Sequence, residues 1–357
     1  MKFGIAIPTD AESWRLVRRA EELGFDHAWF YDTQMLSADP FVAMAACAMK
    51  TTRIRLGTGV LIPSNRIAAV AANAFASLNK LAPGRIDFGV GTGFTGRRAM
   101  GLGAVKLADM EEYIRVVQAL WRGETVESKV EGKPRLIRLL NPDLGLINTN
   151  GDLPVSIAAS GPKARALTAK IAAGWIDGAP GVAQSVAALA SMRETWAAAG
   201  QSPEALNAIA WAGGCVLRPG EPADSPRAIA QAGPRTMTLL HRAADAVLGG
   251  YPPINLPAEF ADKVAGYVEM ARNYGPQGAH YLDNHRGHLM FVRSDERPFL
   301  TGEMIRRMTW TAEEGELTER VAALEAAGFS QIVFSILPGQ ESAVEDWGRI
   351  RGMFALD

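Results

Sequence analysis

The chain has 357 residues, of which 48% are hydrophobic, and its 37 basic and 38 acidic residues leave a formal net charge of −1. This length is sufficient for a full hydrophobic core and lies near the upper size of one continuous core. A near-neutral chain without a long basic run gives no reason to expect nucleic acid or an anionic membrane as a partner.

The composition also indicates the compartment. Cys47 and Cys215 form neither a CxxC motif nor a disulfide framework, which suits a reducing cytoplasm. No signal-peptide pattern follows Met1, and the longest apolar helix, predicted around residues 67–78, is too short to span a bilayer. We therefore expect a soluble, cytoplasmic protein with no membrane partner.

Strand and helix patterns alternate along the chain about eight times. Apolar runs predict strands over residues 3–8, 25–31, 54–62, 85–90, 154–159, 175–178, 208–217 and 331–337. Helical patterns follow over residues 13–23, 39–50, 67–81, 109–121, 162–173, 182–199, 317–327 and 341–354. Such alternation predicts an α/β protein with a parallel sheet and right-handed crossovers.

Two stretches interrupt the alternation and are expected to be insertions. Residues 124–153 suggest a hairpin, and residues 219–310 are irregular, with helical pieces predicted over 226–247 and 257–273. Strand–helix units return after each insertion up to the C-terminus, which favours a (β/α)₈ TIM barrel over a doubly wound sheet. No linker divides the chain, so we expect one domain over residues 1–357.

In a (β/α)₈ barrel the chemistry lies at the C-terminal ends of the strands. Small or polar residues follow several predicted strands, at 32–34, 58–60, 92–93, 159–161 and 177–178. Glycine at these ends would let a flat ligand or a phosphate approach the backbone, because no Cβ stands in the way. Ser160 and Gly161 precede a helix, so they suit a phosphate, or Ser160 simply caps that helix.

Two other motifs have weaker implications. Residues 91–96 match GxGxxG after a strand, but a Rossmann fingerprint needs an immediate helix and an acidic residue closing the next strand. Asp109 and Glu111 begin a helix instead, so a dinucleotide-binding fold is not expected. The Arg97-Arg98 pair favours a solvated face over a phosphate contact.

His280, His285 and His288 cluster in the second insertion. Their spacing fits neither HExxH nor a Cys/His zinc pattern, so we predict no metal site. An acid/base or hydrogen-bonding role for one of them is one hypothesis, and a structural polar role is the other. His27 and His241 are interpreted as ordinary strand and helix residues.

Four motifs together resemble one known family. The motifs, in chain order, are Gly57-Thr58-Gly59-Val60, Gly84-Arg85 with Gly89-Val90-Gly91-Thr92-Gly93, Ala158-Ala159-Ser160-Gly161-Pro162, and Trp175-Ile176-Asp177-Gly178. Their order and spacing resemble the bacterial luciferase-like flavin-dependent superfamily. Within it the chain looks most like the branch with the coenzyme F420-dependent methylenetetrahydromethanopterin reductases. The resemblance covers most of residues 1–215 and resumes at about 310–357.

The resemblance implies a barrel that holds FMN or F420 at its C-terminal face. It implies a bulge at Gly59 and Val60, often with a non-proline cis peptide, that backs the ring of the cofactor. It also implies phosphate contacts at Ser160 and Gly161, which favours a phosphate-binding role for them over a helix cap. The predicted cofactor-binding residues are Thr58, Gly59, Val60, Thr92, Gly93, Ala159, Ser160, Gly161 and Gly178. Many members have histidine after the aspartate of the second strand, whereas this chain has Thr33 after Asp32.

These features lead to a ranked set of functions. We expect a monooxygenase that uses reduced FMN and oxygen on a small-molecule substrate, with Asp32, His285 and His288 as candidate catalytic residues. The alternative is an F420-dependent dehydrogenase or reductase that transfers a hydride without oxygen. A metal-dependent barrel hydrolase and a non-catalytic flavin-binding protein are more remote alternatives. The resemblance further implies a homodimer or higher homo-oligomer and a possible separate flavin or F420 reductase.

Overall fold

The computed structural model describes residues 1–255 and 257–354, and its centre is a closed barrel of eight parallel strands. Each strand pairs with the strands before and after it in the series, and the last pairs with the first. The strands are β1 (Lys2–Ile7), β2 (His27–Phe30), β3 (Arg55–Thr58), β4 (Ile86–Val90), β7 (Val155–Ala158), β8 (Gly174–Asp177), β9 (Ala208–Ala212) and β12 (Gln331–Ser335). Because β1 pairs with β12, the expected (β/α)₈ barrel is confirmed and a doubly wound sheet is excluded.

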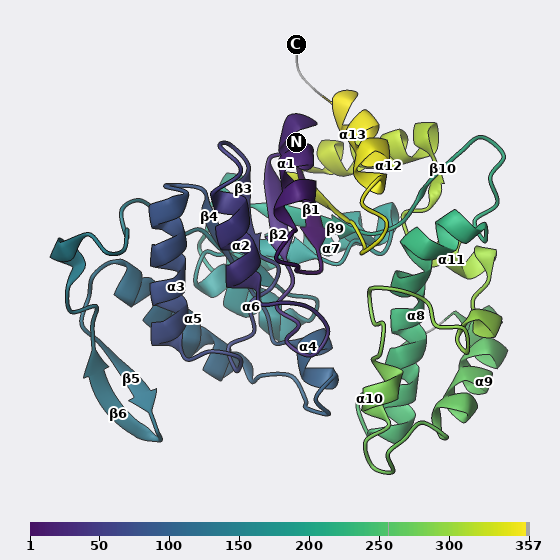
Figure 1. Cartoon of the computed structure of the whole chain (residues 1–357), viewed down its shortest axis with the longest axis horizontal. Helices are drawn as coiled ribbons and strands as arrows, with labels where there is room; N and C mark the ends of the chain where they lie inside the picture. Colours follow the sequence, from purple (N-terminus) through teal and green to yellow (C-terminus); the bar gives the residue numbers. More distant parts are fainter. Residues whose placement is uncertain (256, 355–357) are drawn as a thin grey trace.

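Helices surround this barrel (Figure 1). The helices that follow the barrel strands are α1 (Trp14–Glu22), α2 (Pro40–Ala48), α3 (Ala68–Leu81), α5 (Leu107–Trp121), α6 (Pro162–Lys170), α7 (Val182–Ala198), α12 (Glu314–Ala327) and α13 (Ala343–Gly352). A short helix, α4 (Phe94–Arg98), stands between β4 and α5. Among the described residues, no helix combines the length and the apolar character needed to cross a membrane.

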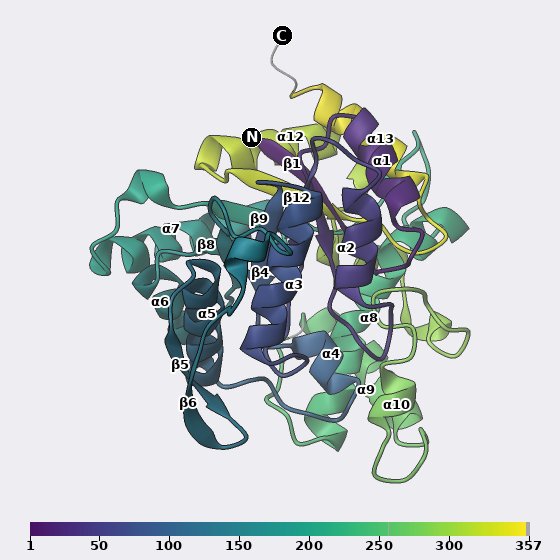
Figure 2. The same ribbon diagram turned by 60° about the vertical axis from the view of Figure 1, so that its left-hand side comes forward.

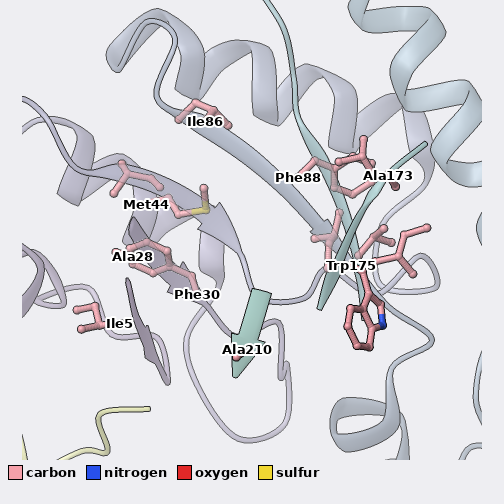
Figure 3. Packing of buried hydrophobic residues seen from close by; sticks show 14 of the residues in the cluster. Ile5, Ala28, Phe30, Met44, Ile86, Phe88, Ala173, Trp175 and Ala210 are labelled. Carbon is pink, nitrogen blue, oxygen red and sulfur yellow. The ribbon is translucent and has the colours of Figure 1, made fainter. Parts of the chain in front are cut away.

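Side chains alternate between the two faces of the strands, as the period of a β-strand requires. Ile5, Phe30 and Phe88 point outward into the main hydrophobic core, where they pack among helix residues such as Met44 (Figure 3). The inward positions form a separate cluster, in which Trp29 and Trp211 are the largest members. The barrel interior is therefore filled by side chains and is not a channel.

The two expected insertions are present. The first contains an antiparallel hairpin of β5 (Val126–Val130) and β6 (Lys133–Ile137). The second contains α8 (Pro226–Leu248), α9 (Ala261–Ala271), α10 (Tyr281–Asn284) and α11 (Gly302–Met308), with a hydrophobic cluster of its own. Figures 1 and 2 both show α8, α9 and α10 on one side of the barrel, away from the hairpin. The expectation of a single domain stays a prediction.

One predicted strand is divided in the structure. The sequence predicts a strand over 208–217, but β9 ends at Ala212 and a short strand, β10 (Val216–Leu217), pairs instead with β11 (Ala312–Glu313). Gly214 lies in the break, where a Cβ would come within 2.1 Å of the Trp310 carbonyl oxygen. The apolar run is continuous in sequence, but this backbone crossing redirects it.

The close packing of Gly89 against the backbone of β3 leads to a first prediction. A Cβ at Gly89 would lie 2.1 Å from the Thr58 carbonyl oxygen, and backbone cannot yield as a flexible side chain can. We expect Gly89→Ala to lower the free energy of unfolding by about 3 kcal/mol in urea denaturation. Gly103→Ala is the control, because no described atom lies within 4 Å of its added Cβ. An unchanged midpoint for Gly89→Ala would contradict the prediction.

Candidate functional site

Two adjoining cavities open at the C-terminal ends of the barrel strands. The smaller has a volume of about 260 Å³ and the larger about 530 Å³. The residues that line both are Phe94, Thr95, Ser160, Gly178, Arg235 and Leu289. Because these residues are shared, the two cavities form one continuous site between the barrel and the second insertion.

The floor of the smaller cavity is apolar and built on glycine. The Gly59–Val60 peptide bond is cis, at the position that the resemblance indicated, and both residues line the cavity. A Cβ at Gly59 would lie 2.6 Å from the Trp211 ring. A Cβ at Gly91 would lie 2.6 Å from a methyl carbon of Val60. Glycine thus allows backbone and indole to pack into a flat surface on which a planar ring can lie.

Tyr31 stands beside this floor. Its hydroxyl donates to Ser335 Oγ over 3.1 Å, and its ring lies 6.2 Å from the Trp211 ring. Burial raises the pKa of Tyr31 above its ordinary value, so the phenol keeps its proton. Tyr31 therefore lines the smaller cavity with a neutral phenol.

The larger cavity has a positively charged wall. Arg165, Arg235 and Arg242 line it, opposed by Asp177. Asp177 accepts hydrogen bonds from Ser185 Oγ at 2.8 Å and from the Ala179 backbone at 3.1 Å. None of the described acidic side chains forms a salt bridge with the three arginines.

Several donors of this wall lack protein acceptors. Within residues 1–255 and 257–354, the Nε atoms of Arg165 and Arg242 are buried without a hydrogen-bond partner. Arg235 donates to the Gly178 carbonyl over 2.5 Å, and burial lowers the pKa of its guanidinium, which still remains charged. Buried donors without acceptors are costly in isolation, so the wall suits an anionic group.

The carboxylate of Asp32, a candidate catalytic residue, accepts hydrogen bonds from protein groups on both of its oxygens. Its Oδ2 accepts from the Ile62 backbone at 2.9 Å and from Asn65 at 3.0 Å. Its Oδ1 accepts from Arg66 at 3.1 Å. Asp32 borders the smaller cavity but is buried, and its carboxylate holds the loop after β3 in place. The structure thus gives Asp32 a positioning contact, while its catalytic role stays a prediction.

The two candidate histidines differ in position. His288 borders the larger cavity, and its Nε2 lies 3.4 Å from Thr95 Oγ1. Burial and neighbouring positive charge hold the pKa of His288 well below its usual range, so it is neutral. His285 is outside the lining of both cavities and binds Asp245 at 3.0 Å.

Five of the nine predicted cofactor residues line the site, and four do not. Gly59, Val60, Gly93, Ser160 and Gly178 border one or both cavities. Thr58, Thr92, Ala159 and Gly161 are outside the lining of these cavities, in the part of the chain that the structure describes. Thr58 Oγ1 instead donates to the Gly89 carbonyl at 2.7 Å, and the Ala159 carbonyl accepts from Trp175 Nε1 at 2.8 Å.

Two sequence-based interpretations are wrong. Gly161, not Ser160, is the N-cap residue of α6, so the Ser160 side chain is left at the cavities. Arg98 does not lie on a solvated face: it is buried, with its guanidinium carbon 3.0 Å from the centre of the Tyr251 ring. Helix α6 begins at Pro162, which suits the first helical position, and Arg98 is covered by Tyr251 of the second insertion.

Sequence analysis missed several residues of the site. Trp211 lies in β9 and Tyr31 directly follows β2, and the inward direction of both depends on register. Arg235 and Leu289 lie in the second insertion, which the resemblance does not cover. The alternation of strand residues could have indicated Trp211. Within the pattern of α8, nothing separates Arg235 from an exposed arginine.

Comparisons with known proteins agree with this architecture. A family model described as luciferase-like monooxygenase matches residues 1–331. The 5,10-methylenetetrahydromethanopterin reductase of Archaeoglobus fulgidus is 27% identical over 341 residues, covering 93% of this chain and 92% of that protein. An F420-dependent glucose-6-phosphate dehydrogenase of Beutenbergia cavernae is 34% identical over 172 residues, covering 44% of this chain and 49% of that protein.

A solved structure matches along the whole length. The coenzyme F420-dependent tetrahydromethanopterin reductase from Methanopyrus kandleri superposes with a TM-score of 0.73 at 20% identity. The alignment covers 99% of both chains. At this identity the likeness shows the fold.

The contacts of Asp32 lead to a second prediction. Asp32→Ala leaves the buried Ile62 N–H without its acceptor and removes the partner of Arg66, so we expect the free energy of unfolding to fall by about 3 kcal/mol in urea denaturation. Asp39→Asn is the control, because Asp39 pairs with the same Arg66 at an exposed position and should cost less than about 1 kcal/mol. Equal losses of unfolding free energy in the two variants would contradict the prediction that the buried contacts of Asp32 stabilise the fold more than the exposed pair of Asp39.

Proposed function

We propose that this chain, which belongs to the luciferase-like monooxygenase family of oxidoreductases, is a coenzyme F420-dependent enzyme that transfers a hydride to or from a small organic substrate. The observation that carries the proposal is the match to an F420-dependent type of reductase over 93% of the chain. The comparisons thus favour the function that sequence analysis ranked second, and the FMN-dependent monooxygenase becomes the alternative. The family description is what still favours that alternative.

The residues present fit a cofactor with a flat ring and a phosphorylated tail. The floor at Gly59, Val60 and Trp211 offers an apolar surface for a ring, with no Cβ above Gly59. The tail would meet the guanidinium groups of Arg165 and Arg242, which line the larger cavity. Ser160 adds a hydroxyl beside the N-terminus of α6, where backbone N–H groups favour anions.

When bound, F420 supplies a carbon that donates or accepts a hydride, and the chain supplies position and surroundings. Trp211 and Val60 fix the plane against which a ring lies. Phe94 and Leu289 close the cavities from the side of α4 and the second insertion, which limits the access of water. Arg235 places a positive charge at the junction of the two cavities, where it stabilises negative charge.

Tyr31 is the residue that we assign to contact the substrate oxygen. Its phenol stays protonated, and Ser335 Oγ lies 3.1 Å away. Because either hydroxyl can donate, Ser335 can turn its proton to Tyr31, and Tyr31 then donates to a substrate oxygen in the cavity. This assignment needs no movement of the backbone.

The choice of cofactor yields a third prediction. We expect purified apoprotein to bind F420 at least about tenfold more tightly than FMN or reduced FMN, a difference of about 1.4 kcal/mol, in a fluorescence titration. Tighter binding of reduced FMN would favour the monooxygenase. Binding of none of the three would contradict the cofactor site itself.

The positive wall yields a fourth prediction. Arg165→Gln removes a charged donor from the larger cavity, so we expect cofactor affinity to fall by about tenfold or more, with a weaker dependence on salt. Lys163→Gln is the matched control, since Lys163 carries the same charge on α6 but is exposed outside the cavity. Equal effects of the two variants would mean that general charge, and not the orphaned donor of Arg165, determines binding.

A further inference from the structure

Three histidines meet in the second insertion, beside the larger cavity, whose lining includes one of them, His288. His241 comes from α8, and His285 and His288 follow α10, which packs beside α8 (Figures 1 and 2). Their exposed fractions are 1%, 1% and 2%. One ring nitrogen of each lies within 4.8 Å of the other two. The sequence spacing concealed this group, because His241 is 44 positions before His285 in the printed chain.

The outer nitrogen of each ring is occupied by an oxygen. His241 Nε2 lies 2.7 Å from Glu296 Oε1, and His285 Nε2 lies 3.0 Å from Asp245 Oδ2. His288 Nε2 lies 3.4 Å from Thr95 Oγ1. An ionised carboxylate can only accept, so His241 and His285 carry their protons on Nε2, which leaves a lone pair on Nδ1 of each ring.

The inner nitrogens are incompletely satisfied by the protein. His241 Nδ1 and His288 Nδ1 lie 2.8 Å apart, which accounts for one shared proton. His285 Nδ1 is buried and has no hydrogen-bond partner among the described residues. One proton can therefore satisfy two of the three rings at most, and the third lone pair stays unpaired at the cost of a buried polar atom.

We propose that His241, His285 and His288 bind a divalent transition-metal ion of the zinc class through their three Nδ1 atoms. Three imidazoles suit zinc, cobalt or nickel, whereas magnesium and calcium prefer oxygen ligands. Zinc–nitrogen bonds of about 2.0 Å would place ligand nitrogens about 3.3 Å apart, so the His241–His288 pair need separate by only about half an ångström. The ion would take the place of the shared proton, which moves to His288 Nε2 and is donated to Thr95 Oγ1, and all three rings are then satisfied.

The surroundings match a metal site beyond its ligands. A histidine ligand usually donates its other ring N–H to a carboxylate or hydroxyl, and Glu296, Asp245 and Thr95 occupy those places.

Both signs of charge face this cluster. Arg293 pairs with Glu296 at 3.0 Å and offsets that carboxylate, and the Arg242 charge also opposes a cation near His288. Asp245 is different: its partners are His285 and Asn284 Nδ2 at 2.9 Å, and it forms no salt bridge with a described lysine or arginine. A metal ion on His285 would supply the positive charge that this buried carboxylate lacks.

Metal binding at this place would reach the larger cavity. Leu289 directly follows His288, lines both cavities and has a positive φ of 60°. A metal bound to His285, His288 and His241 would link the segment after α10 to α8. Because Arg235 lies on the same helix as His241, the link would fix the position of Leu289 relative to Arg235. We assign the ion this structural role because all three ligands are buried and only His288 borders the larger cavity.

The test is a fifth prediction and uses the full chain, purified without a histidine tag. Elemental analysis of the purified protein is expected to give about one zinc-class ion per chain, or the chelator-treated protein to take up about one Co²⁺ with a visible absorption band of nitrogen ligation. We expect the ion to raise the melting temperature, because it binds the folded state. If the purified protein contains no metal and the chelator-treated protein takes up neither Zn²⁺ nor Co²⁺, the proposal is overturned and the cluster is a shared-proton network.

Variants locate the ion. His285→Gln and His288→Gln should each lower metal content by about tenfold or more, and His280→Gln, a histidine outside the cluster, should not. Metal retained in both ligand variants would place it elsewhere and overturn the assignment. If a ligand variant does not fold, the Co²⁺ spectrum of the wild-type chain decides, since a spectrum of oxygen ligation alone would also overturn it. None of these measurements depends on which cofactor the chain binds.

Discussion

The close approach of β3 and β4 is the constraint on which the site depends. Gly57 lies against the Trp29 ring, where a Cβ would be 2.7 Å from a ring carbon, and Gly89 lies against the Thr58 carbonyl. These contacts leave room for the indoles of Trp29 and Trp211 inside the barrel. The same two indole residues lie directly against Gly59, so they determine where the floor of the smaller cavity lies. A flat, apolar surface at the mouth of the barrel is therefore a consequence of how its interior is filled.

Helix α8 joins the barrel to everything that the second insertion adds. It carries Arg235 and Arg242 toward the cavities and His241 toward the buried cluster, while Met237 packs in the second hydrophobic cluster. One rigid element thus presents charge on one side and metal-binding chemistry on another. The proposed ion and the proposed cofactor would act on different faces of the same helix, and neither proposal requires the other.

Part of the site could be predicted because it depends on local backbone geometry. The positions of Gly59, Val60, Gly93, Ser160 and Gly178 follow from where strands end, and strand ends follow from apolar runs closed by small residues. Asp32 lies at a predicted strand end too, but its carboxylate turns to the loop after β3. Position along a strand therefore indicated which residues approach the site and left open what each side chain binds.

The sequence by itself determined the alternation of strands and helices, the two insertions and most strand ends, though not the end of β9, since period and turn residues act over a few neighbours. Only the tertiary structure decided that Arg235 faces Gly178 and that His241 meets His285 and His288. Such contacts join segments that are far apart in the chain, and they are set by packing and by the need to pair buried polar atoms. Nothing in the local pattern of α8 distinguishes these residues from others on the same helix.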